Sequence, residues 1–391
     1  MKQGWEIKKL GEVCEIVNGS TPLRTNKDFW ENGNFPWFTI DDIREQGRII
    51  TATKQKVTEA ALSKLRVLPV NTVLLCCTAS VGEYAITKIE LTSNQQFNGL
   101  IVRDKKNLCP DFLMHYCATL KDKLFELSGK TTIDFIAISK LKTLEIPLPP
   151  LAEQQRIVSI LDKAFAAIDQ AKAHAERNLR NARELFESYL AGVFENEENN
   201  SLSFGEVCEL VGGSQPSKEN FIFELKAGYV RLIQVRDYRT DKFVTYIPKS
   251  LAKRFCDKND IMIGRYGPPI FGIFKGLEGA YNVALMKAIV NEKLCNRTYF
   301  YWFLQNKKIR DFVEQSSKRA VGQDGVRKEL LEKYPVPVPP IKKQQSIVRQ
   351  LDALRAKTQQ LEAVYQMRIV DLEEMKKSIL QKAFSGELKT T

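Results

Sequence analysis

Histidine is scarce in this sequence, and cysteine shows no metal-binding pattern. The 391 residues include two histidines, His115 and His174, and the eight cysteines form no Cys-x-x-Cys pair. Zinc sites in proteins are built mostly from cysteine and histidine at short, characteristic spacings. The sequence therefore excludes a recognisable zinc site, and we expect the chain to bind no metal.

Long apolar runs are also absent. No stretch reaches the roughly 18 consecutive apolar residues that indicate a membrane-spanning helix. The first ten residues, MKQGWEIKKL, lack the apolar core of a secretory signal peptide. These absences predict a soluble, cytoplasmic protein in a reducing compartment.

Positive charge is abundant. The net charge is +12 and the pI is near 9.2, while 43% hydrophobic and 27% charged residues are ordinary values for a globular protein. The charge is spread over both halves, which favours a basic folded surface over a disordered arm. A chain of this length predicts two or more domains, and its charge predicts an acidic partner, with nucleic acid ahead of a membrane surface.

The sequence contains a tandem duplication. Residues 146–162, IPLPPLAEQQRIVSILD, recur at 336–352 as VPVPPIKKQQSIVRQLD, with nine of seventeen positions identical. Proline cannot lie inside a helix but often precedes one. Each copy therefore predicts an extended Pro-rich segment, named here the Pro hook (146–150 and 336–340), followed by a long helix.

The two halves also begin alike. Residues 10–22, LGEVCEIVNGSTP, match residues 204–216, FGEVCELVGGSQP, at nine of thirteen positions. Both segments indicate a short element that enters a tight turn. Cys14 and Cys208 occupy the same place, which indicates small buried side chains.

The segments between these matched ends differ in sequence but predict the same order of strands and helices. Residues 37–43, WFTIDDI, and 232–238, LIQVRDY, alternate like strands. Further short strands follow in each half, and then an aromatic-rich helix over 110–127 and over 297–315. Each half is therefore predicted to be a mixed α/β globule of roughly 140 residues.

Apolar residues recur every seven positions along both predicted long helices. The rows in the first helix are Leu161, Ile168, Ala175, Ala182 and Tyr189, and Val158, Phe165, Leu179, Phe186 and Val193. The rows in the second helix are Leu351, Thr358, Tyr365, Leu372 and Ile379, and Ile347, Leu354, Leu361 and Met375. Two apolar rows on a helix of about 40 residues need a long partner helix to cover them. The only similar helix predicted in this sequence is the other copy. We expect an antiparallel coiled coil with the globules at opposite ends about a pseudo-twofold axis. The alternative, in which each helix folds onto its own globule, leaves one row unexplained.

The duplicated hook and helix resemble the specificity subunits of type I restriction–modification systems. Such subunits contain two target-recognition domains, each followed by a Pro hook and a helix that opens with E-Q-Q-R-I-V-x-x-L-D. That pattern is present at 153–162, and the second copy departs from it at Lys343 and Ser346. The G-S-T-P turn at 19–22 and the run F-W-x-N-G-x-x-P-W at 29–37 resemble one recognition-domain subtype. The resemblance covers essentially the whole chain.

The resemblance implies an α+β fold made of four segments. These are a first target-recognition domain (1–145), a Pro hook and coiled-coil helix (146–194), a second target-recognition domain (195–335), and a second Pro hook and helix (336–391). The two domains would be separated by the antiparallel helix pair. Each domain would read one half of a bipartite DNA site, and the helix pair would set the spacer.

The loops between matched strands supply candidate DNA contacts, because Lys and Arg bind phosphates while amides, hydroxyls and Arg read base edges. The candidates in the first domain are Ser20, Thr21, Arg24, Lys27, Thr78, Ser80, Gln95, Gln96 and Lys130. The candidates in the second domain are Ser214, Lys218, Arg236, Arg239, Arg265, Tyr266, Lys318, Arg319, Gln323 and Arg327.

Local patterns that resemble catalytic motifs are incomplete. Residues 129–131, Gly-Lys-Thr, lack the earlier glycine of a phosphate-binding loop, because Leu124 stands there. None of the three Pro-Pro pairs follows the Asp or Asn that an adenine methyltransferase loop uses, and Pro110-Asp111 has no nearby Glu-x-Lys of a nuclease. His115 lies among apolar residues and is expected to be a packing residue. We therefore expect a non-catalytic chain.

The resemblance also implies partners. These are double-stranded DNA, two modification subunits that use S-adenosylmethionine, and two restriction subunits, if present, that use ATP and Mg²⁺. This chain would bind none of these cofactors, and its long helices, with Phe186, Tyr189 and Phe384 near their ends, would dock the modification subunits. Two other classes compete: a stand-alone methyltransferase or nuclease, and a purely structural coiled-coil spacer.

Overall fold

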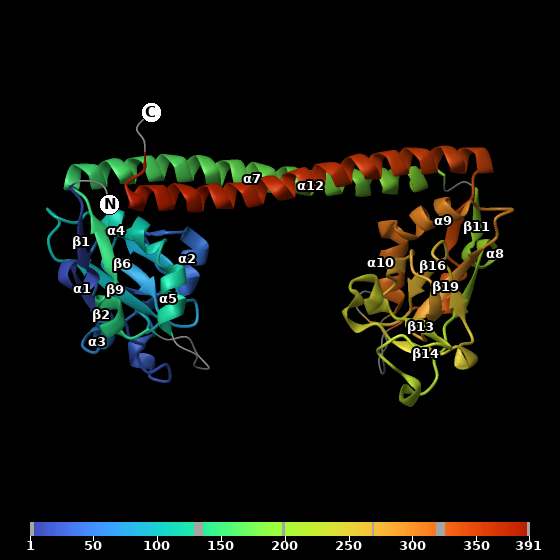
Figure 1. The fold of residues 1–391 in the computed structure, drawn as a ribbon, viewed down its shortest axis with the longest axis horizontal. Coiled ribbons are helices and arrows are strands. Elements are labelled where there is room, and N and C mark those ends of the chain that lie inside the picture. The colour runs from blue at the N-terminus through green and yellow to red at the C-terminus, as the bar shows by residue number, and fades with distance from the viewer. Residues whose placement is uncertain (1–3, 129–135, 198–199, 268–269, 318–324, 389–391) are drawn as a thin grey trace. The chain divides into compact units, whose positions relative to one another are not determined.

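The chain forms two compact units, residues 1–175 with 367–391 and residues 176–366. The computed structural model describes residues 4–128, 136–197, 200–267, 270–317 and 325–388. Each unit contains one globule and a part of two long helices, α7 (Leu151–Glu195) and α12 (Ile341–Ser385) (Figure 1). The predicted organisation, two mixed α/β globules with two long helices, is confirmed.

The first globule contains three sheets within its described residues. Their strand orders are β2-β9-β6-β7-β4, β5-β3-β8 and β1-β10. The strands are β1 (Glu6–Lys9), β2 (Cys14–Asn18), β3 (Phe35–Phe38), β4 (Ile49–Ile50), β5 (Gln55–Val57), β6 (Val73–Cys76), β7 (Tyr84–Thr87), β8 (Thr92–Ser93), β9 (Phe97–Val102) and β10 (Glu145–Leu148). The helices are α1 (Leu10–Val13), η1 (Lys27–Phe29), α2 (Ile40–Gln46), α3 (Glu59–Leu62), α4 (Pro110–Cys117), α5 (Lys121–Ser128) and α6 (Ile138–Lys142).

The second globule also contains three sheets in the part of the chain that the structure describes. Their strand orders are β12-β19-β16-β17, β14-β13-β18-β15 and β11-β20. The strands are β11 (Ser201–Ser203), β12 (Cys208–Gly212), β13 (Tyr229–Ile233), β14 (Tyr246–Pro248), β15 (Phe255–Cys256), β16 (Ile261–Gly264), β17 (Ile273–Phe274), β18 (Gly279–Tyr281), β19 (Leu285–Val290) and β20 (Pro335–Pro337). The helices are α8 (Phe204–Val207), η2 (Lys218–Asn220), η3 (Val235–Tyr238), η4 (Asp241–Phe243), η5 (Lys249–Leu251), α9 (Arg297–Leu304), α10 (Lys307–Ser317) and α11 (Lys328–Leu331).

The duplication extends to strand order and strand direction. The order β2-β9-β6-β7 in the first globule corresponds to β12-β19-β16-β17 in the second. The central strand β3 pairs antiparallel with β5 and parallel with β8, and β13 pairs in the same way with β14 and β18. Both Pro hooks begin as the strand, β10 or β20, that pairs antiparallel with the first strand of its own globule.

Two sequence-based assignments are wrong in part. Residues 37–43 and 232–238 were expected to be strands, but only their first two residues are, and α2 and η3 follow. Asp42 and Asp237 explain the change, because each carboxylate accepts a hydrogen bond from a backbone N–H three residues earlier, at Thr39 (2.7 Å) and Gln234 (3.0 Å). Such a capping interaction stabilises a helix start and overrides the local alternation. The aromatic-rich helices are likewise interrupted, into α4 and α5 and into α9 and α10.

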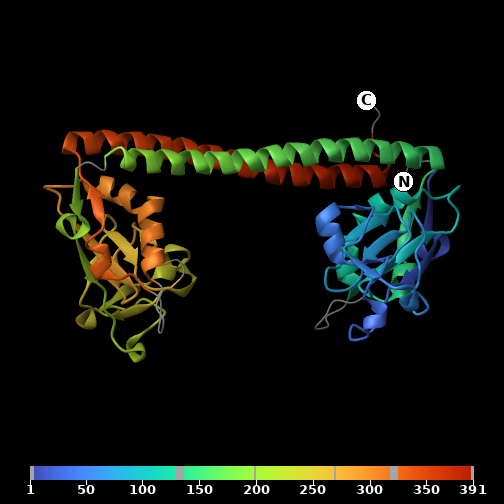
Figure 2. The same cartoon turned by 180° about the vertical axis from the view of Figure 1, so that it is seen from behind.

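Within each unit, α7 and α12 lie side by side and run antiparallel, as predicted (Figures 1 and 2). In the first unit, Lys376 of α12 pairs with Asp169 of α7 at 2.9 Å. In the second unit, Arg183 of α7 pairs with Glu362 of α12 at 3.2 Å. The helices also pack against the globules, but they do so in addition to pairing with each other, so the alternative in which each helix folds onto its own globule alone is wrong.

The helices share the core of each globule. The first core includes Ile157, Leu161, Phe165 and Ile168 of α7 with Leu380 and Ala383 of α12. The second core includes Phe186, Leu190 and Phe194 of α7 with Ile347 and Leu351 of α12. The predicted apolar rows are therefore largely buried, but Leu361 and Met375 are 42% and 51% exposed. Those two residues do not serve the helix pair.

Each helix is held to its globule by a fully buried glutamine. Gln154 Oε1 accepts a hydrogen bond from the backbone N–H of Cys109 at 2.8 Å, and its Nε2 donates to the carbonyls of Asn107 and Pro149, both at 2.8 Å. Gln344 repeats the arrangement with Asn296, Leu294 and Pro339 at 2.7, 3.0 and 2.7 Å. The first glutamine of the duplicated Gln-Gln pair is therefore an anchor, and we name this arrangement the glutamine clamp.

A second duplicated contact lies eight residues, or about two turns, further along each helix. Asp162 is hydrogen-bonded to the ring of His115 at 2.7 Å, and Asp352 accepts a hydrogen bond from Trp302 Nε1 at 2.8 Å. The two aspartates are the last matched residues of the duplicated segment. His115 is thus a buried packing and anchoring residue, as expected from the sequence.

Candidate nucleic-acid interface

A close backbone approach explains the Gly-Ser-x-Pro turn in each half. A Cβ atom on Gly19 would lie 2.1 Å from the carbonyl oxygen of Asn94, and one on Gly213 would lie 2.0 Å from that of Asn282. Both distances are far shorter than a nonbonded contact allows, so only glycine fits. The turn is consequently fixed against the chain that precedes β9 or β19.

Three segments meet at this point in each globule. The backbone N–H of Asn94 donates to the carbonyl of Phe38 (3.1 Å), and that of Asn282 donates to the carbonyl of Ile233 (3.0 Å). The end of the central strand is thereby joined to the same turn. We name residues 19–22, 38–42 and 93–97 the first loop junction, and residues 213–216, 233–237 and 281–285 the second loop junction.

Four of the predicted contacts in the first globule, Ser20, Thr21, Gln95 and Gln96, belong to the first loop junction, and two more lie beside it. The backbone N–H of Ser20 donates to the carbonyl of Ser93 at 2.9 Å, and the Thr21 hydroxyl donates to Gln95 Oε1. Gln96 accepts a hydrogen bond from the Asn94 amide at 3.0 Å. Its carbonyl accepts from the N–H of Cys77 at 2.9 Å, which brings the loop with Thr78 and Ser80 alongside.

Arg24 lies next to this junction in a pre-oriented position. Its guanidinium lies 3.9 Å from the ring centroid of Trp30 and 4.6 Å from that of Trp37, and its Nη1 donates to Gln55 Oε1 at 2.8 Å. Trp37 Nε1 donates in turn to the carbonyl of Ser20 at 3.2 Å. Burial lowers the pKa of Arg24, but the group stays charged at neutral pH. Lys27, by contrast, pairs with Glu31 at the start of η1.

The predicted contacts of the second globule converge in the same way. Arg236, Arg239 and Tyr266 line an open pocket of about 350 Å³ together with Gln234 and Asn282 of the second loop junction.

The remaining candidates lie beside that pocket. The backbone N–H of Arg265 donates to the carbonyl of Ala284 at 2.8 Å, and its guanidinium lies 4.9 Å from the Tyr266 ring centroid. Val326, which precedes Arg327, donates to the carbonyl of Arg265 at 3.0 Å. The N–H of Ser214 donates to the carbonyl of Tyr281 at 3.1 Å, so Ser214 belongs to the junction itself. Lys218 begins η2, and Lys130, Lys318, Arg319 and Gln323 lie outside the described residues.

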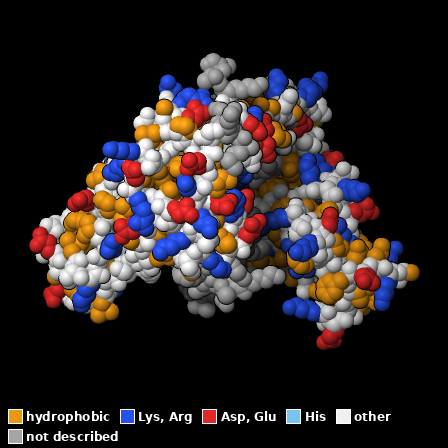
Figure 3. All heavy atoms as spheres, turned by 60° about the vertical axis from the view of Figure 1, so that its left-hand side comes forward, with side chains coloured by type: hydrophobic (Ala, Val, Ile, Leu, Met, Phe, Trp, Pro, Cys, Tyr) orange, Lys and Arg blue, Asp and Glu red, His pale blue; other side chains and the backbone are white. Residues whose placement is uncertain are grey.

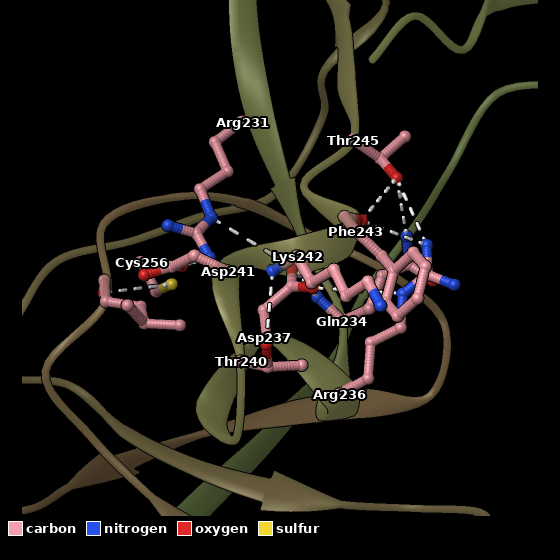
Figure 4. A network of polar contacts seen from close by, with 11 residues as sticks. Arg231, Gln234, Arg236, Asp237, Thr240, Asp241, Lys242, Phe243, Thr245 and Cys256 are labelled. Atoms are coloured by element: carbon pink, nitrogen blue, oxygen red, sulfur yellow. Dashed lines mark hydrogen bonds and ion pairs between the residues drawn. The ribbon is translucent and has the colours of Figure 1, made fainter. Parts of the chain in front are cut away.

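Figure 4 shows the polar network behind this pocket. Arg236 Nη2 donates to the carbonyl of Phe243 at 3.2 Å and to Thr245 Oγ1 at 3.3 Å, and its Nε lies 3.9 Å from Asp237 Oδ1. The Asp237 side chain is fully buried, and Oδ1 has no hydrogen-bond donor among the described residues. Burial raises the pKa of Asp237, while Gln234 and two arginines oppose that shift. The carboxylate thus lies beside the Arg236 side chain.

Cys14 and Cys77 are buried in the first globule. Burial raises the pKa of the Cys14 and Cys77 thiols to about 12, so neither is a nucleophile at neutral pH. Among the residues described, no three His, Cys, Asp or Glu side chains are grouped so as to hold a metal ion. None of the described helices has the length and apolar character needed to cross a membrane. On the face seen in Figure 3, Lys and Arg side chains are interspersed with Asp and Glu.

The sequence did not point to Asp41, Gln55, Gln234 or Asn282. Asp41 stands in the matched segment 37–43 at the place that Arg236 holds in 232–238, so an alignment of the two segments contained that signal. Gln55 meets Arg24 only because β5 pairs with β3. No sequence pattern marks such a contact.

The profile of the family described as "Type I restriction modification DNA specificity domain" matches residues 2–177 and again residues 196–366. The EcoprrI type I restriction enzyme specificity subunit of Escherichia coli is 27% identical over 383 residues, which cover 92% of this chain and 90% of that protein. The MjaIX specificity subunit of Methanocaldococcus jannaschii is 31% identical over 250 residues, which cover 58% of this chain and 57% of that protein.

Solved structures share the fold. A chain in a structure described as "Structural basis underlying complex assembly and conformational transition of the type I R-M system" has a TM-score of 0.83 at 20% identity, with 99% of both chains covered. The HsdS subunit from Thermoanaerobacter tengcongensis has a TM-score of 0.62 at 20% identity, with 99% of this chain and 98% of that chain covered.

Proposed function

This chain belongs to the family of the type I restriction modification DNA specificity domain, and we propose that it is the subunit that selects the DNA sequence for a type I restriction–modification complex. Each globule reads one half of a bipartite site through its loop junction. Lys and Arg bind phosphates, and amide, hydroxyl and guanidinium groups read base edges. The paired helices set the length of the spacer between the half-sites.

The observation that carries this proposal is that the two loop junctions share one backbone arrangement but are surrounded by different side chains. In both loop junctions a glycine lies against the carbonyl of an asparagine, Asn94 or Asn282, and the backbone hydrogen bonds are the same. The exposed and half-buried side chains around them differ, with Arg24, Gln55 and Gln95 in the first globule and Arg236, Arg239 and Tyr266 in the second. Two domains that recognise different half-site sequences need the same backbone arrangement with different side chains on it.

The chemistry resides in the partners. Two modification subunits supply adenine methylation with S-adenosylmethionine, and two restriction subunits, where present, use ATP and Mg²⁺. The relatives are named specificity subunits of type I restriction enzymes, which supports a partnership of this chain with other subunits of such an enzyme. This chain acts by binding DNA and binds none of the cofactors.

The docking surface for the modification subunits lies on α12. Phe186 and Phe384 were expected to contribute, but Phe186 packs on Trp302 of the second globule (ring centroids 5.4 Å apart) and Phe384 packs on Phe112 of the first (5.1 Å). The large exposed apolar side chains of α12 are Leu361, Val364, Met367, Val370 and Met375. An apolar face of this kind is typical of a surface that a partner covers.

Methylome sequencing tests the proposal. Cells with this chain and its modification partner should methylate adenines in a bipartite motif, and cells from which this chain alone is deleted should lose that methylation. Methylation that persists without the chain, or a purified chain that methylates or cleaves DNA alone, would replace this proposal with a stand-alone enzyme.

A further inference from the structure

Position 41 of the first globule and position 236 of the second are structurally equivalent. Phe38 pairs in parallel with Ser93 in β8, and Ile233 pairs in parallel with Tyr281 in β18. The helical segment that follows each strand is capped by Asp42 or Asp237 in the same manner. Asp41 and Arg236 each lie three residues after the end of the strand and one residue before the capping aspartate. They therefore occupy equivalent positions in the two globules.

The two side chains at this place have opposite hydrogen-bonding chemistry. A carboxylate only accepts hydrogen bonds, and a guanidinium only donates them. Both are half-exposed, at 53% for Asp41 and 47% for Arg236. A position that contacted phosphate in both globules would not carry a carboxylate in one of them, because the two anions repel each other. The contrast favours contact with base edges, which offer donors as well as acceptors in the major groove.

Arg236 is oriented before any ligand arrives. Nη2 is held by Phe243 and Thr245, and Nε faces the buried carboxylate of Asp237 (Figure 4). Free arginine side chains lose rotamer freedom when they bind, and a side chain already held in place loses less. The guanidinium also lines the pocket with Tyr266 and Asn282, where a base edge has room to enter.

We propose that residues 41 and 236 are matched specificity-determining residues: Arg236 donates to O6 and N7 of a guanine in one half-site, and Asp41 accepts from N4 of a cytosine in the other. Asp237 is a positioning residue for Arg236. This inference rests on the proposed function and names the base that each globule selects at one position.

The test uses the full chain in complex with its modification partner and a library of duplexes with randomised bases. The wild-type complex should select a bipartite motif that includes one guanine read by the second globule and one cytosine read by the first. Arg236→Gln and Arg236→Ala should each reduce the preference for that guanine by roughly 5- to 150-fold, because neither side chain offers the two forked donors that bind O6 and N7. Asp41→Asn should relax the cytosine in the other half-site. All other positions should stay as in the wild type, which also reports that the variants are folded.

Arg297→Gln is the matched control. Arg297 is 45% exposed in the same globule and pairs with Glu292 on the surface, so the variant removes the same charge at similar exposure. It should leave the motif unchanged. If Arg236→Gln and Arg236→Ala keep the guanine preference, or weaken binding to all sequences equally, Arg236 is a phosphate contact and the inference is wrong. If the wild-type complex selects no bipartite motif, the proposed function itself fails, which is a separate outcome.

Discussion

The two glutamines of the duplicated Gln-Gln pair have different environments. Gln154 and Gln344 are fully buried in the glutamine clamps, whereas Gln155 and Gln345 are exposed. Removal of a buried amide that binds three backbone groups leaves all three without hydrogen-bond partners. Each unpaired buried group lowers the free energy of unfolding by about 1–3 kcal/mol. The clamp therefore explains why the first glutamine recurs at both hooks.

We predict that Gln154→Ala lowers the free energy of unfolding by about 3 kcal/mol or more, and that Gln344→Ala does the same in the second unit. Gln155→Ala is the control, because an exposed substitution on the same turn should change stability by no more than about 0.5 kcal/mol. Urea denaturation of the full chain measures both. Equal effects of the Gln154 and Gln155 variants would contradict the role of the clamp.

His115 makes one of the two duplicated ring–aspartate contacts dependent on pH. Burial lowers the pKa of His115 below its ordinary value of 6.5, although the hydrogen bond to Asp162 opposes that shift. The unfolded chain then binds the proton more readily than the folded chain. The associated stability is present above pH 6.5 and is lost as the pH falls through the lowered pKa. Trp302, which replaces His115 in the second globule, does not titrate.

Between pH 7.5 and 5.5, the wild-type chain should therefore lose stability relative to His115→Gln, with a slope of up to about 1.4 kcal/mol per pH unit. His174→Gln is the control, because His174 is exposed on α7 and is the second of the two histidines. The measurement is denaturation of each variant at several pH values. An identical pH profile for the wild type and His115→Gln would show that His115 has no such effect.

The two long helices differ although their sequences are related. The rows of α7 are largely buried, while α12 leaves Leu361 and Met375 of one row exposed and adds Val364, Met367 and Val370 nearby. Part of α12 meets α7 and the globules, and these five apolar side chains stay exposed among the described residues of the chain. That arrangement supports docking of another subunit on α12.

Val364→Glu and Met367→Glu should each abolish co-purification with the modification subunit, because an unpaired carboxylate buried in an apolar interface costs several kcal/mol. Gln359→Glu is the matched control, since it introduces the same charge at an exposed position about 140° around the helix from Val364 and about 12 Å along the axis from Met367. Both globules should stay folded, as circular dichroism will report. Unchanged co-purification of the two variants would place the docking surface elsewhere.

For the whole molecule, the proposed spacing role gives a length prediction. The pairing of Asp169 with Lys376 places Val370 opposite Ala175 in the antiparallel register. A four-residue insertion after each of these two residues lengthens both helices by about 6 Å, near two base pairs of duplex. A coiled coil absorbs four extra residues as a stutter.

The double insertion should therefore lengthen the non-specific spacer of the methylated motif by one or two base pairs and leave both half-site sequences unchanged. An insertion in α7 alone is the control, because it breaks the register with α12 and should reduce methylation of all sites. Methylome sequencing reads out both variants. An unchanged spacer in the double insertion would show that the helices do not set the distance.

The duplication, the two long helices and the Pro hooks were readable from residue order alone. Their signals are local: seventeen-residue repeats, a seven-residue apolar period and proline before a helix. The family resemblance followed from the same segments. The candidate DNA contacts near the Gly-Ser-x-Pro turn were also predicted in this way, because polar side chains between matched strands are visible in the sequence, and their role stays a prediction.

Contacts between distant segments were settled by packing. The glutamine clamp joins Gln154 to Cys109, 45 positions away, and the strand-to-helix change at Asp42 depends on whether its carboxylate reaches a backbone N–H. The equivalence of Asp41 and Arg236 likewise rests on the strand register in each globule. The sequence limits which contacts are chemically possible. The free energy that selects among these contacts comes from burial and from hydrogen bonds, and both form only when the strands and helices pack together.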